Sequence, residues 1–407
     1  MAHWFSHAFT IPRASRYASP ADGAALLPLV FGDFTAHGRT GPLPAVLIDT
    51  ANAVYCAAGH AVESITEVWV GETQKTIGVD VTVTVSNNYE AQGNIATLDF
   101  AAIQTDVVTW RGKGYPSGGS AITNPITQIE TLFNTFHPDW TSADWDATAL
   151  EIARGIATTK GYEGAWVIAD GATSGEWLTE MLLNVLGAWR VNGDHKVELL
   201  LDDGTTPVDP AAMDAHVVAS RDCIGGDDGV EMTFDVAQLV TDLDVEYAFH
   251  WAGEHFSSAV VTNTAAESAT AHGEHRKRFG LRGVRLAAHL NTWAAIVLAR
   301  ADFMTRVEGA MLRFTIKGPR ALHLGVMDVI GFSWPRFGPL RERGNPYRNE
   351  VLRVVEVDHD ATGAGRSAVA AIDLGGFLTT RTKFDKAVKF DATKRFGGDG
   401  RLLTVLG

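Results

Sequence analysis

The chain has 407 residues and a formal net charge of −14, a length that allows two to four domains. Its hydrophobic content of 46% supplies enough apolar side chains for real cores, which argues against a disordered chain. A sequence pI near 5.4 argues against a dedicated binder of nucleic acid or of anionic membranes, because such proteins need a basic face. No apolar run approaches the roughly 20 residues of a membrane-spanning helix, and the start lacks the basic and apolar regions of a secretory leader.

Residues 1–122 are predicted to form a β domain. Val79, Val81, Val83 and Val85 alternate with polar residues, and a period of two is typical of a half-buried strand. Other short apolar runs predict strands at Leu27–Phe31, Ala45–Ile48, Val68–Val70 and Ile95–Phe100. Glycine, asparagine and proline predict turns or loops at Asn87–Asn88, Gln92–Asn94 and Trp110–Gly119.

Residues 123–201 are predicted to form a mixed α/β domain. Asn124 can cap a helix that has Pro125 at its first position, and a second helix fits Asp146–Lys160 before Gly161. Thr173 and Glu176 have the spacing of a capping box, which predicts a third helix. Apolar residues on one face of the first helix are Ile126, Ile129, Leu132, Phe133 and Phe136. Strands are expected at Ala165–Ile168 and Lys196–Leu201, the latter returning from a hairpin turn at Asn192–Gly193.

Residues 202–290 are predicted to be a β segment. Leu243, Val245, Tyr247, Phe249 and Trp251 alternate with a mostly acidic set, which predicts a strand with one apolar face and one acidic face. Ser258–Thr262 is expected to pair with this strand, and Ala271–Arg278 is expected to be a loop.

Residues 291–407 are predicted to contain a helix, a β-barrel-like domain and a docked tail. The helix is expected over Thr292–Val307. Strands are expected at Ala310–Lys317, Val326–Phe332, Val351–Val357 and Ala368–Leu374, with turns at Gly318–Pro319 and Thr362–Gly365. The polar tail after Phe377 carries Phe384, Phe390 and Phe396, and is interpreted as an arm docked on a neighbour.

The residues that could carry chemistry do not form a recognisable active site. Arg111–Gly114 lacks the spacing of a phosphate-binding loop. The motif His272–Gly273–Glu274–His275 has no evident third metal ligand, and His250 and His255 flank a turn. Asp202–Asp203 and Asp227–Asp228 each precede a glycine, a pattern more typical of turns than of paired catalytic acids. Cys56 and Cys223 are expected to be buried free thiols. We therefore predict no catalytic, cofactor-binding or metal-ligating residue, and no enzyme.

Four parts of the chain resemble the central hub proteins at the tail tip or baseplate of long-tailed bacteriophages. Leu29–Thr35 resembles the opening of many tail-tip proteins, and Gly175–Leu201 is similar to the helix and hairpin of a hub's α/β part. Thr292–Lys317 resembles the helix and strand that open the second barrel of a hub. Leu322–Ile330 and Arg353–Leu374 resemble the closing strands of that barrel.

The resemblance implies an α+β, β-dominated fold with two β-barrel-like, tail-tube-like domains and an inserted α/β domain. It implies a structural virion protein that forms a homotrimeric hub, joins the hexameric tail tube to tip or fibre proteins, and ends the DNA channel. The implied partners are the tube or distal-tail ring, the tape-measure protein and tip proteins, without specific nucleic-acid binding or stable membrane insertion. The implied location is the virion tail tip, after assembly in the host cytoplasm. The chain ends at Gly407 without a lysozyme, peptidase or fibre domain, so wall digestion by this chain is not expected.

Other interpretations stay open at this point. The chain could form a hexameric distal-tail ring or a receptor-binding tip protein, and a carbohydrate-active enzyme that uses paired acids is a further alternative. The acidity could line a channel that repels DNA, or could serve ordinary solubility.

Overall fold

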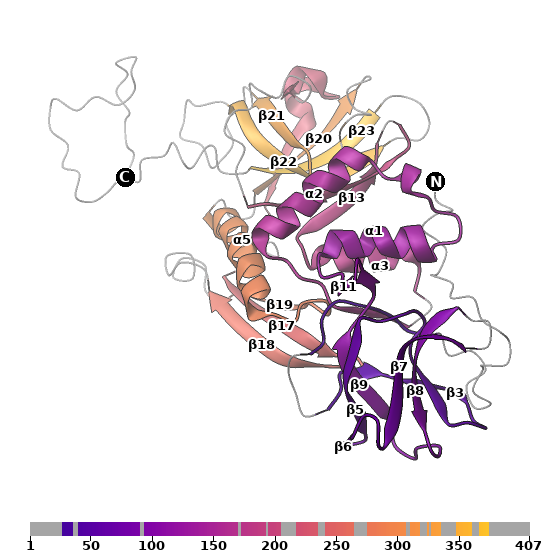
Figure 1. Ribbon diagram of the computed structural model, residues 1–407. Coiled ribbons are helices and arrows are strands. Elements are labelled where there is room, and N and C mark those ends of the chain that lie inside the picture. The colour runs from indigo at the N-terminus through magenta and orange to yellow at the C-terminus, as the bar shows by residue number, and fades with distance from the viewer. Residues whose placement is uncertain are drawn as a thin grey trace.

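The computed structural model has an α+β fold dominated by strands. Figure 1 shows the N-terminal strands at one end of the molecule, the helices in the middle and the C-terminal sheet at the other end. The residues that the structure describes are 27–35, 40–89, 93–169, 172–192, 194–204, 217–234, 241–263, 275–306, 310–317, 324, 327–334, 347–359 and 366–373. Within these ranges, no helix combines the length and apolarity that crossing a membrane requires.

Two four-stranded antiparallel sheets form the N-terminal unit. The first has the order β2–β9–β5–β6 and the second β3–β4–β8–β7. Their strands are β2 (Leu43–Pro44), β3 (Val46–Asp49), β4 (Val54–Ala58), β5 (Ser64–Val70), β6 (Thr73–Lys75), β7 (Val81–Asn88), β8 (Asn94–Phe100) and β9 (Val108–Lys113). Tyr55 and Leu98 of one sheet and Val68 and Trp110 of the other belong to the same apolar core. The alternation of apolar and polar residues in the sequence therefore reflects strands whose inner faces share that core.

The boundaries of this unit correct three predictions. Val79 is 82% exposed and lies in a turn before β7, whereas Asn87–Asn88 ends β7 and is not a turn. The predicted loop Trp110–Gly119 is the end of β9 followed by a small hairpin of β10 (Pro116–Ser117) and β11 (Ser120–Ala121). Gly112 explains the error, because a Cβ there would overlap the backbone of β5. This glycine allows two strands to approach closely and does not mark a turn.

The α/β unit contains three helices, and its apolar core extends to the N-terminal strand β1. Its elements are β1 (Leu29–Phe31), α1 (Pro125–Phe136), α2 (Ala147–Lys160), β12 (Trp166–Ile168), α3 (Ser174–Leu183), β13 (Gly187–Val191) and β14 (Val197–Leu201). β1 pairs antiparallel with β12, and β13 with β14. Four buried tryptophans, Trp140, Trp145, Trp166 and Trp177, lie in this core. The three helices and the hairpin lie at the positions in the chain that the sequence predicted.

The helix ends confirm the predicted caps. The Asn124 side chain accepts hydrogen bonds from the backbone N–H groups of Ile126 at 3.0 Å and Thr127 at 3.2 Å. Thr173 and Glu176 form the capping box at the start of α3. Gly161 ends α2 with φ +67°, a left-handed conformation that glycine adopts without strain.

Replacing Asn124 with alanine should destabilise the protein by about 1 kcal/mol, because two N–H groups at the start of α1 lose their acceptor. Urea denaturation measures the change in the free energy of unfolding. Asn124→Asp keeps a side-chain oxygen that accepts from these N–H groups, although it loses the Nδ2 donor to Arg154 O and Thr158 Oγ1, so it should retain part of the stability. Equal losses in the two variants would show that the cap is not what stabilises this helix start.

A three-stranded sheet with a long helix forms the third unit. Its elements are β17 (Asp242–His250), β18 (His255–Asn263), β19 (Arg276–Gly280) and α5 (Ala287–Arg306). β17 pairs antiparallel with β18 and parallel with β19. Leu243 and Val245 of β17 are buried with Leu290 and Trp293 of α5. The predicted apolar face of β17 is thus confirmed, and it packs on the helix.

Two boundaries in this unit differ from the prediction. Arg276–Arg278 belongs to strand β19 and not to a loop. The register places Asp244 of β17 beside Arg278 of β19, and Arg278 forms an ion pair with Glu246 of β17. Opposite charges on neighbouring strands thus stabilise β19, which lacks the apolar alternation that a strand usually shows. The helix predicted from Thr292 already begins at Ala287, because Leu290 in its first turn packs under β17.

A six-stranded sheet completes the fold. Its order is β15–β21–β22–β23–β20–β16, and it curves into a half-barrel. Its strands are β15 (Val217–Ala219), β16 (Val230–Phe234), β20 (Ala310–Lys317), β21 (Val329–Trp334), β22 (Tyr347–His359) and β23 (Arg366–Asp373). Leu312, Phe314 and Ile316 point into its core, as their alternation predicted. Strands that precede and follow residue 290, the predicted boundary between the last two segments, therefore belong to one sheet.

Some predictions stay untested. The division into residues 1–122, 123–201, 202–290 and 291–407 and the presence of two barrels stay predictions. The turns at Gly318–Pro319 and Thr362–Gly365, the motif residues His272–Glu274 and the tail after Phe377 lie outside the described residues. Cys56 and Cys223 are buried thiols that form no disulfide in the described part of the chain, as predicted.

Candidate functional site: the junction between the α/β unit and the half-barrel

The half-barrel contacts the α/β unit through ion pairs. Arg353 on β22 pairs with Asp202, which follows β14, and their side chains are only 10% and 11% exposed. Arg190 on β13 pairs with Asp328, which precedes β21. The buried apolar core of the half-barrel contains, among the described residues, only side chains from its own segments. This junction is therefore polar, and its charges form matched pairs, of which Arg353–Asp202 is almost buried and Arg190–Asp328 is partly exposed.

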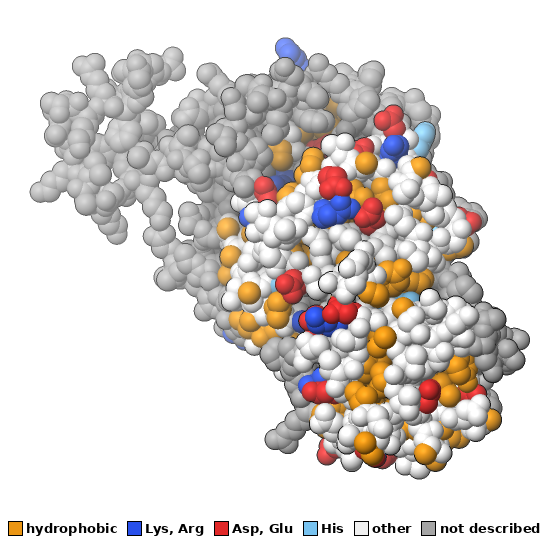
Figure 2. All heavy atoms as spheres, in the orientation of Figure 1, with side chains coloured by type: hydrophobic (Ala, Val, Ile, Leu, Met, Phe, Trp, Pro, Cys, Tyr) orange, Lys and Arg blue, Asp and Glu red, His pale blue; other side chains and the backbone are white. Residues whose placement is uncertain are grey.

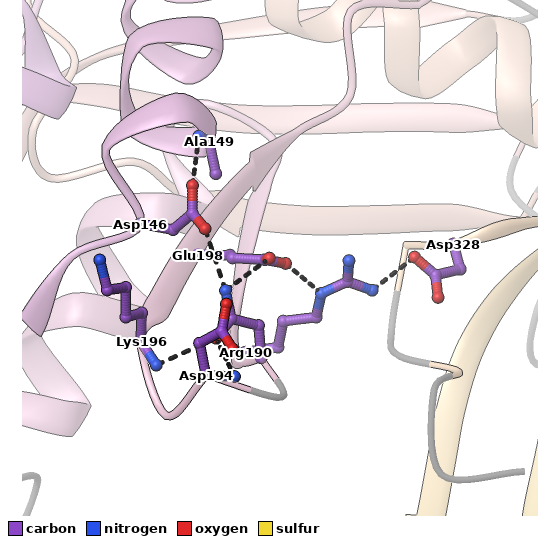
Figure 3. Close-up of polar contacts among 8 residues, drawn as sticks. Asp146, Ala149, Arg190, Asp194, Lys196, Glu198 and Asp328 are labelled. Carbon is purple, nitrogen blue, oxygen red and sulfur yellow. Dashed lines mark hydrogen bonds and ion pairs between the residues drawn. The ribbon is translucent and has the colours of Figure 1, made fainter. Parts of the chain in front are cut away.

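Arg190 is the centre of a network that reaches the start of α2 (Figure 3). Its Nε donates to Glu198 Oε2 at 2.6 Å, directly across the hairpin. Asn192 Nδ2 donates to Glu198 Oε1 at 3.1 Å and to Asp146 Oδ2 at 3.0 Å. Burial disfavours the guanidinium charge, but the hydrogen bond to Glu198 and the charge of Asp328 outweigh it and raise the pKa of Arg190.

Asp202 has both a local and a long-range role. The Gly204 N–H donates to its Oδ1 at 2.9 Å, and Gly204 has φ +76°, which confirms the predicted turn. Its Oδ2 pairs with Arg353. Burial and the Asp202 charge raise the pKa of Tyr162 to about 12. Because this carboxylate is already committed to a buried ion pair, it is poorly suited to serve as a catalytic acid. The side chain of Asp227, the other candidate acid, lies outside the described residues.

His250 and His255 flank a turn, as predicted, and their rings stack at a centroid distance of 5.0 Å. The Gly253 N–H donates to His250 Nδ1 at 2.9 Å, and His250 Nε2 lies 3.1 Å from Thr40 Oγ1. Burial, and then the charges of His255, Arg285 and Arg111, lower the pKa of His250. His250 therefore lies among cationic groups, where protonation of its ring is unfavourable.

Metal ligands do not gather in the described part of the chain. No group of three or more His, Cys, Asp or Glu residues there could hold a metal ion. His275, the described end of the His272–His275 motif, donates its backbone N–H to Thr241 Oγ1 at 2.7 Å. Arg111, from the glycine-containing stretch Arg111–Gly114, is buried in β9 and pairs with Glu67.

The outer face of the half-barrel carries a polar hollow of about 360 Å³. The hollow is lined by Glu231 of β16, Arg313 and Thr315 of β20, Ala368 of β23, and Glu356 and Asp358 of β22. Ala368 lies opposite Thr315 on one neighbouring strand and Asp358 on the other, so a small side chain forms the floor between longer ones. We call Glu231, Arg313, Glu356 and Asp358 the charged face. It contains three carboxylates and one guanidinium, and Arg313 lies 3.6 Å from Glu356.

The helices α1 and α2 carry a pair of opposite surface charges. Arg154 of α2 contacts Glu130 of α1 at 2.6 Å, and Figure 2 shows basic and acidic side chains side by side over these helices. Sequence reasoning found neither this pair nor the junction, because the partners are distant in the chain and carry no local pattern. The charged face has a weak sequence signal, namely the polar residues that alternate with Leu312, Phe314 and Ile316.

Solved structures that are similar to this chain include two prophage tail proteins. No protein-family model and no curated protein matches the chain. The chain is similar to the prophage MuSo2 43 kDa tail protein from Shewanella oneidensis, with a TM-score of 0.33 and 11% identity over 86% of this chain and 94% of that one. It is also similar to the prophage tail protein gp18 from Listeria monocytogenes EGD-e, with a TM-score of 0.32 and 10% identity over 78% of this chain and 90% of that one.

Proposed function

We propose that this chain is a structural, non-enzymatic protein of a bacteriophage tail, and that three copies form a hub at the tail tip. The hub would join the hexameric tail tube to the tip or fibre proteins and would form the end of the DNA channel. Its partners would be the tube or distal-tail ring, the tape-measure protein and the tip proteins. The resemblance of Leu29–Thr35 and of three later parts of the chain to hub proteins prompts this proposal.

The observation that carries the proposal is the half-barrel with its two outer strands. Among the described residues, β15 and β16 each pair with one strand only within this sheet. An outer strand offers backbone N–H and C=O groups to another chain, and proteins that assemble into rings can satisfy these groups with a neighbour's strand. With the N-terminal pair of sheets as a second β unit, three copies would present six β units around an axis, which suits a hexameric tube.

The charged face supports a role at a DNA channel. Glu231, Glu356 and Asp358 lie on the exposed side of the sheet, opposite its apolar core. We propose that carboxylates of this kind line the channel, where negative charge would repel DNA phosphates and let DNA pass without binding. In a structure of the assembly, a neutral or basic channel wall would contradict this part of the proposal.

The mass and symmetry of the purified chain test the proposal. Light scattering should give about three times the 43.7 kDa of one chain, and negative-stain images should show threefold symmetry around a central channel. A hexamer would instead favour the distal-tail ring. A monomer that binds a cell-surface glycan would favour a receptor-binding tip protein.

A carbohydrate-active enzyme is the least supported alternative. One of its candidate acids, Asp202, pairs with Arg353 at the buried junction. Glycan hydrolysis by the purified chain, lost in Asp227→Asn, would contradict the structural role.

A further inference from the structure

The turn between β17 and β18 fastens the three-stranded sheet to the N-terminal unit. The Ala252 N–H donates to the Pro42 carbonyl oxygen at 3.0 Å, and His250 Nε2 lies 3.1 Å from Thr40 Oγ1. Trp251, between these two contacts in the chain, packs against the apolar cores of both the N-terminal unit and the α/β unit. The turn therefore joins parts of the chain that lie 210 residues apart.

Two imidazole rings enclose Gly253 in this turn, residues 250–255, which we call the latch turn. The Gly253 N–H donates to His250 Nδ1 at 2.9 Å, and His255 Nδ1 lies 3.0 Å from the Gly253 carbonyl oxygen. A Cβ at residue 253 would come within 2.7 Å of His255 Nδ1 and 3.1 Å of His250 Nδ1. Glycine therefore allows both rings to close on the backbone of the turn.

These hydrogen bonds fix where the proton of the His250 ring lies. A backbone N–H only donates, so Nδ1 of His250 accepts from Gly253 and carries no proton. The proton of the neutral ring is then on Nε2, which donates to Thr40 Oγ1. A second proton would lie on Nδ1 and point at the Gly253 N–H, so this hydrogen bond would break. A protonated His250 ring is therefore incompatible with the closed latch turn.

Basic side chains around the His250 ring add to the cost of its protonation. His255 stacks on the ring, Arg111 comes from β9, and Arg282 and Arg285 come from the segment between β19 and α5. Burial, and then the charges of His255, Arg285 and Arg111, lower the pKa of His250. The electrostatic effect thus has the same sign as the effect of the hydrogen bonds.

The acidic side chains near the latch turn do not offset this effect. Three of them act on an arginine, namely Glu67 on Arg111 at 3.4 Å, Glu180 on Arg282 at 3.6 Å, and Asp33 on Arg285. Glu254, in the latch turn itself, is exposed, so water and salt screen its charge. The potential at the His250 ring therefore stays positive.

We propose that the latch turn is a proton-sensitive contact, in which protonation of His250 releases this end of the β17–β18 hairpin from the N-terminal unit. The rest of the third unit stays attached, because Trp293 Nε1 of α5 donates to the Leu183 carbonyl oxygen at 2.9 Å, a contact without a titratable group. Acid therefore loosens one end of the hairpin and leaves the unit folded. The inference goes beyond the proposed structural role and does not depend on how many copies assemble.

Hydrogen exchange in the full chain tests the latch turn, because the Ala252 N–H donates across the contact to Pro42. The released His250 ring has the ordinary pKa of 6.5 and the closed ring a lower one, so release becomes more favourable as the pH falls below 6.5. We expect the protection factor of a peptide that contains Ala252 to fall roughly tenfold between pH 7 and pH 5, after correction for intrinsic exchange. A peptide of α5 that contains Trp293 should keep its protection. A loss of equal size in both peptides, or none in either, overturns the proposal.

Two variants assign the effect to the His250 ring. His250→Asn has a side-chain oxygen that accepts from the Gly253 N–H but does not titrate, so protection at Ala252 should change little with pH. Thr40→Val is the matched control: both forms of the ring donate from Nε2, so protection should fall by similar factors at pH 7 and pH 5. A wild-type pH dependence in His250→Asn, or its loss in Thr40→Val, overturns the proposal. The comparison of the two wild-type peptides needs no variant, so it decides even where His250→Asn fails to fold.

Discussion

Arg353→Ala should destabilise the protein by about 3 kcal/mol, because it leaves the Asp202 carboxylate buried without its main counter-charge. We expect the urea midpoint to fall, and the half-barrel to lose protection from hydrogen exchange first, since this pair joins it to the α/β unit. Asp202→Ala should have a similar cost. Replacing both residues with leucine should recover much of the loss, because no lone charge is then buried.

Arg313→Ala is the matched control on the same sheet. Arg313 and Glu356 form a pair at 3.6 Å, but their side chains are 52% and 65% exposed. Exposed pairs contribute at most about 1 kcal/mol, so this variant should change the free energy of unfolding only slightly. Equal losses in Arg313→Ala and Arg353→Ala would show that burial of the pair is not what makes the junction sensitive.

Acid should destabilise the protein through His60, a buried side chain in the N-terminal unit. The Val30 N–H donates to its Nε2 at 2.8 Å, and its Nδ1 lies 2.7 Å from the carbonyl oxygen of Ala61, so the neutral ring is satisfied. Burial lowers the pKa of His60 to about 4 from an ordinary 6.5. At pH values between these two pKa values, the His60 ring is protonated in the unfolded chain and neutral in the folded protein.

The stability that depends on His60 is therefore fully present above pH 6.5 and is lost as the pH falls toward 4. The shift corresponds to about 3 kcal/mol between pH 7 and pH 4. His60→Gln retains a donor and an acceptor but does not titrate. The loss of unfolding free energy between pH 7 and pH 4 should therefore be about 3 kcal/mol smaller in this variant than in the wild type. His289 and His250 also have lowered pKa values, so some acid sensitivity should remain.

His195→Asn is the control for this pH dependence. His195 is exposed and has φ +61°, a conformation that asparagine tolerates. The difference in stability between pH 7 and pH 4 should stay close to that of the wild type. A His60→Gln variant with an unchanged pH dependence would show that another group is responsible for the acid sensitivity.

The sequence predicted those elements whose signals are local. Asn124 and Thr173 mark helix starts through a side chain that reaches two or three residues along the chain. Leu243 and Val245 mark a strand by alternation alone. Gly112 misled the prediction, because the reason for a glycine there is a neighbouring strand that the local sequence does not show. The basic strand β19 was missed because its stabilising partners are acids on β17.

The candidate site was less predictable than the fold. The turn at Asp202 followed from the glycine two residues later, but nothing near it indicates Arg353 as its partner. The same holds for Arg190, whose cross-hairpin partner Glu198 is local whereas Asp328 is not. Ion pairs between units depend on how the units are placed, and a single sequence does not contain that information.

The order of strands in the half-barrel has a consequence for biosynthesis. β15 and β16 leave the ribosome before β17–β19 and α5, but their partners β21 and β20 come afterwards. The N-terminal and α/β units can acquire their cores while translation continues, whereas β15 and β16 must wait for the last part of the chain. During that interval nascent chains expose two unsatisfied strands, so yield in a heterologous host should depend on holdase chaperones and on slow, cool expression.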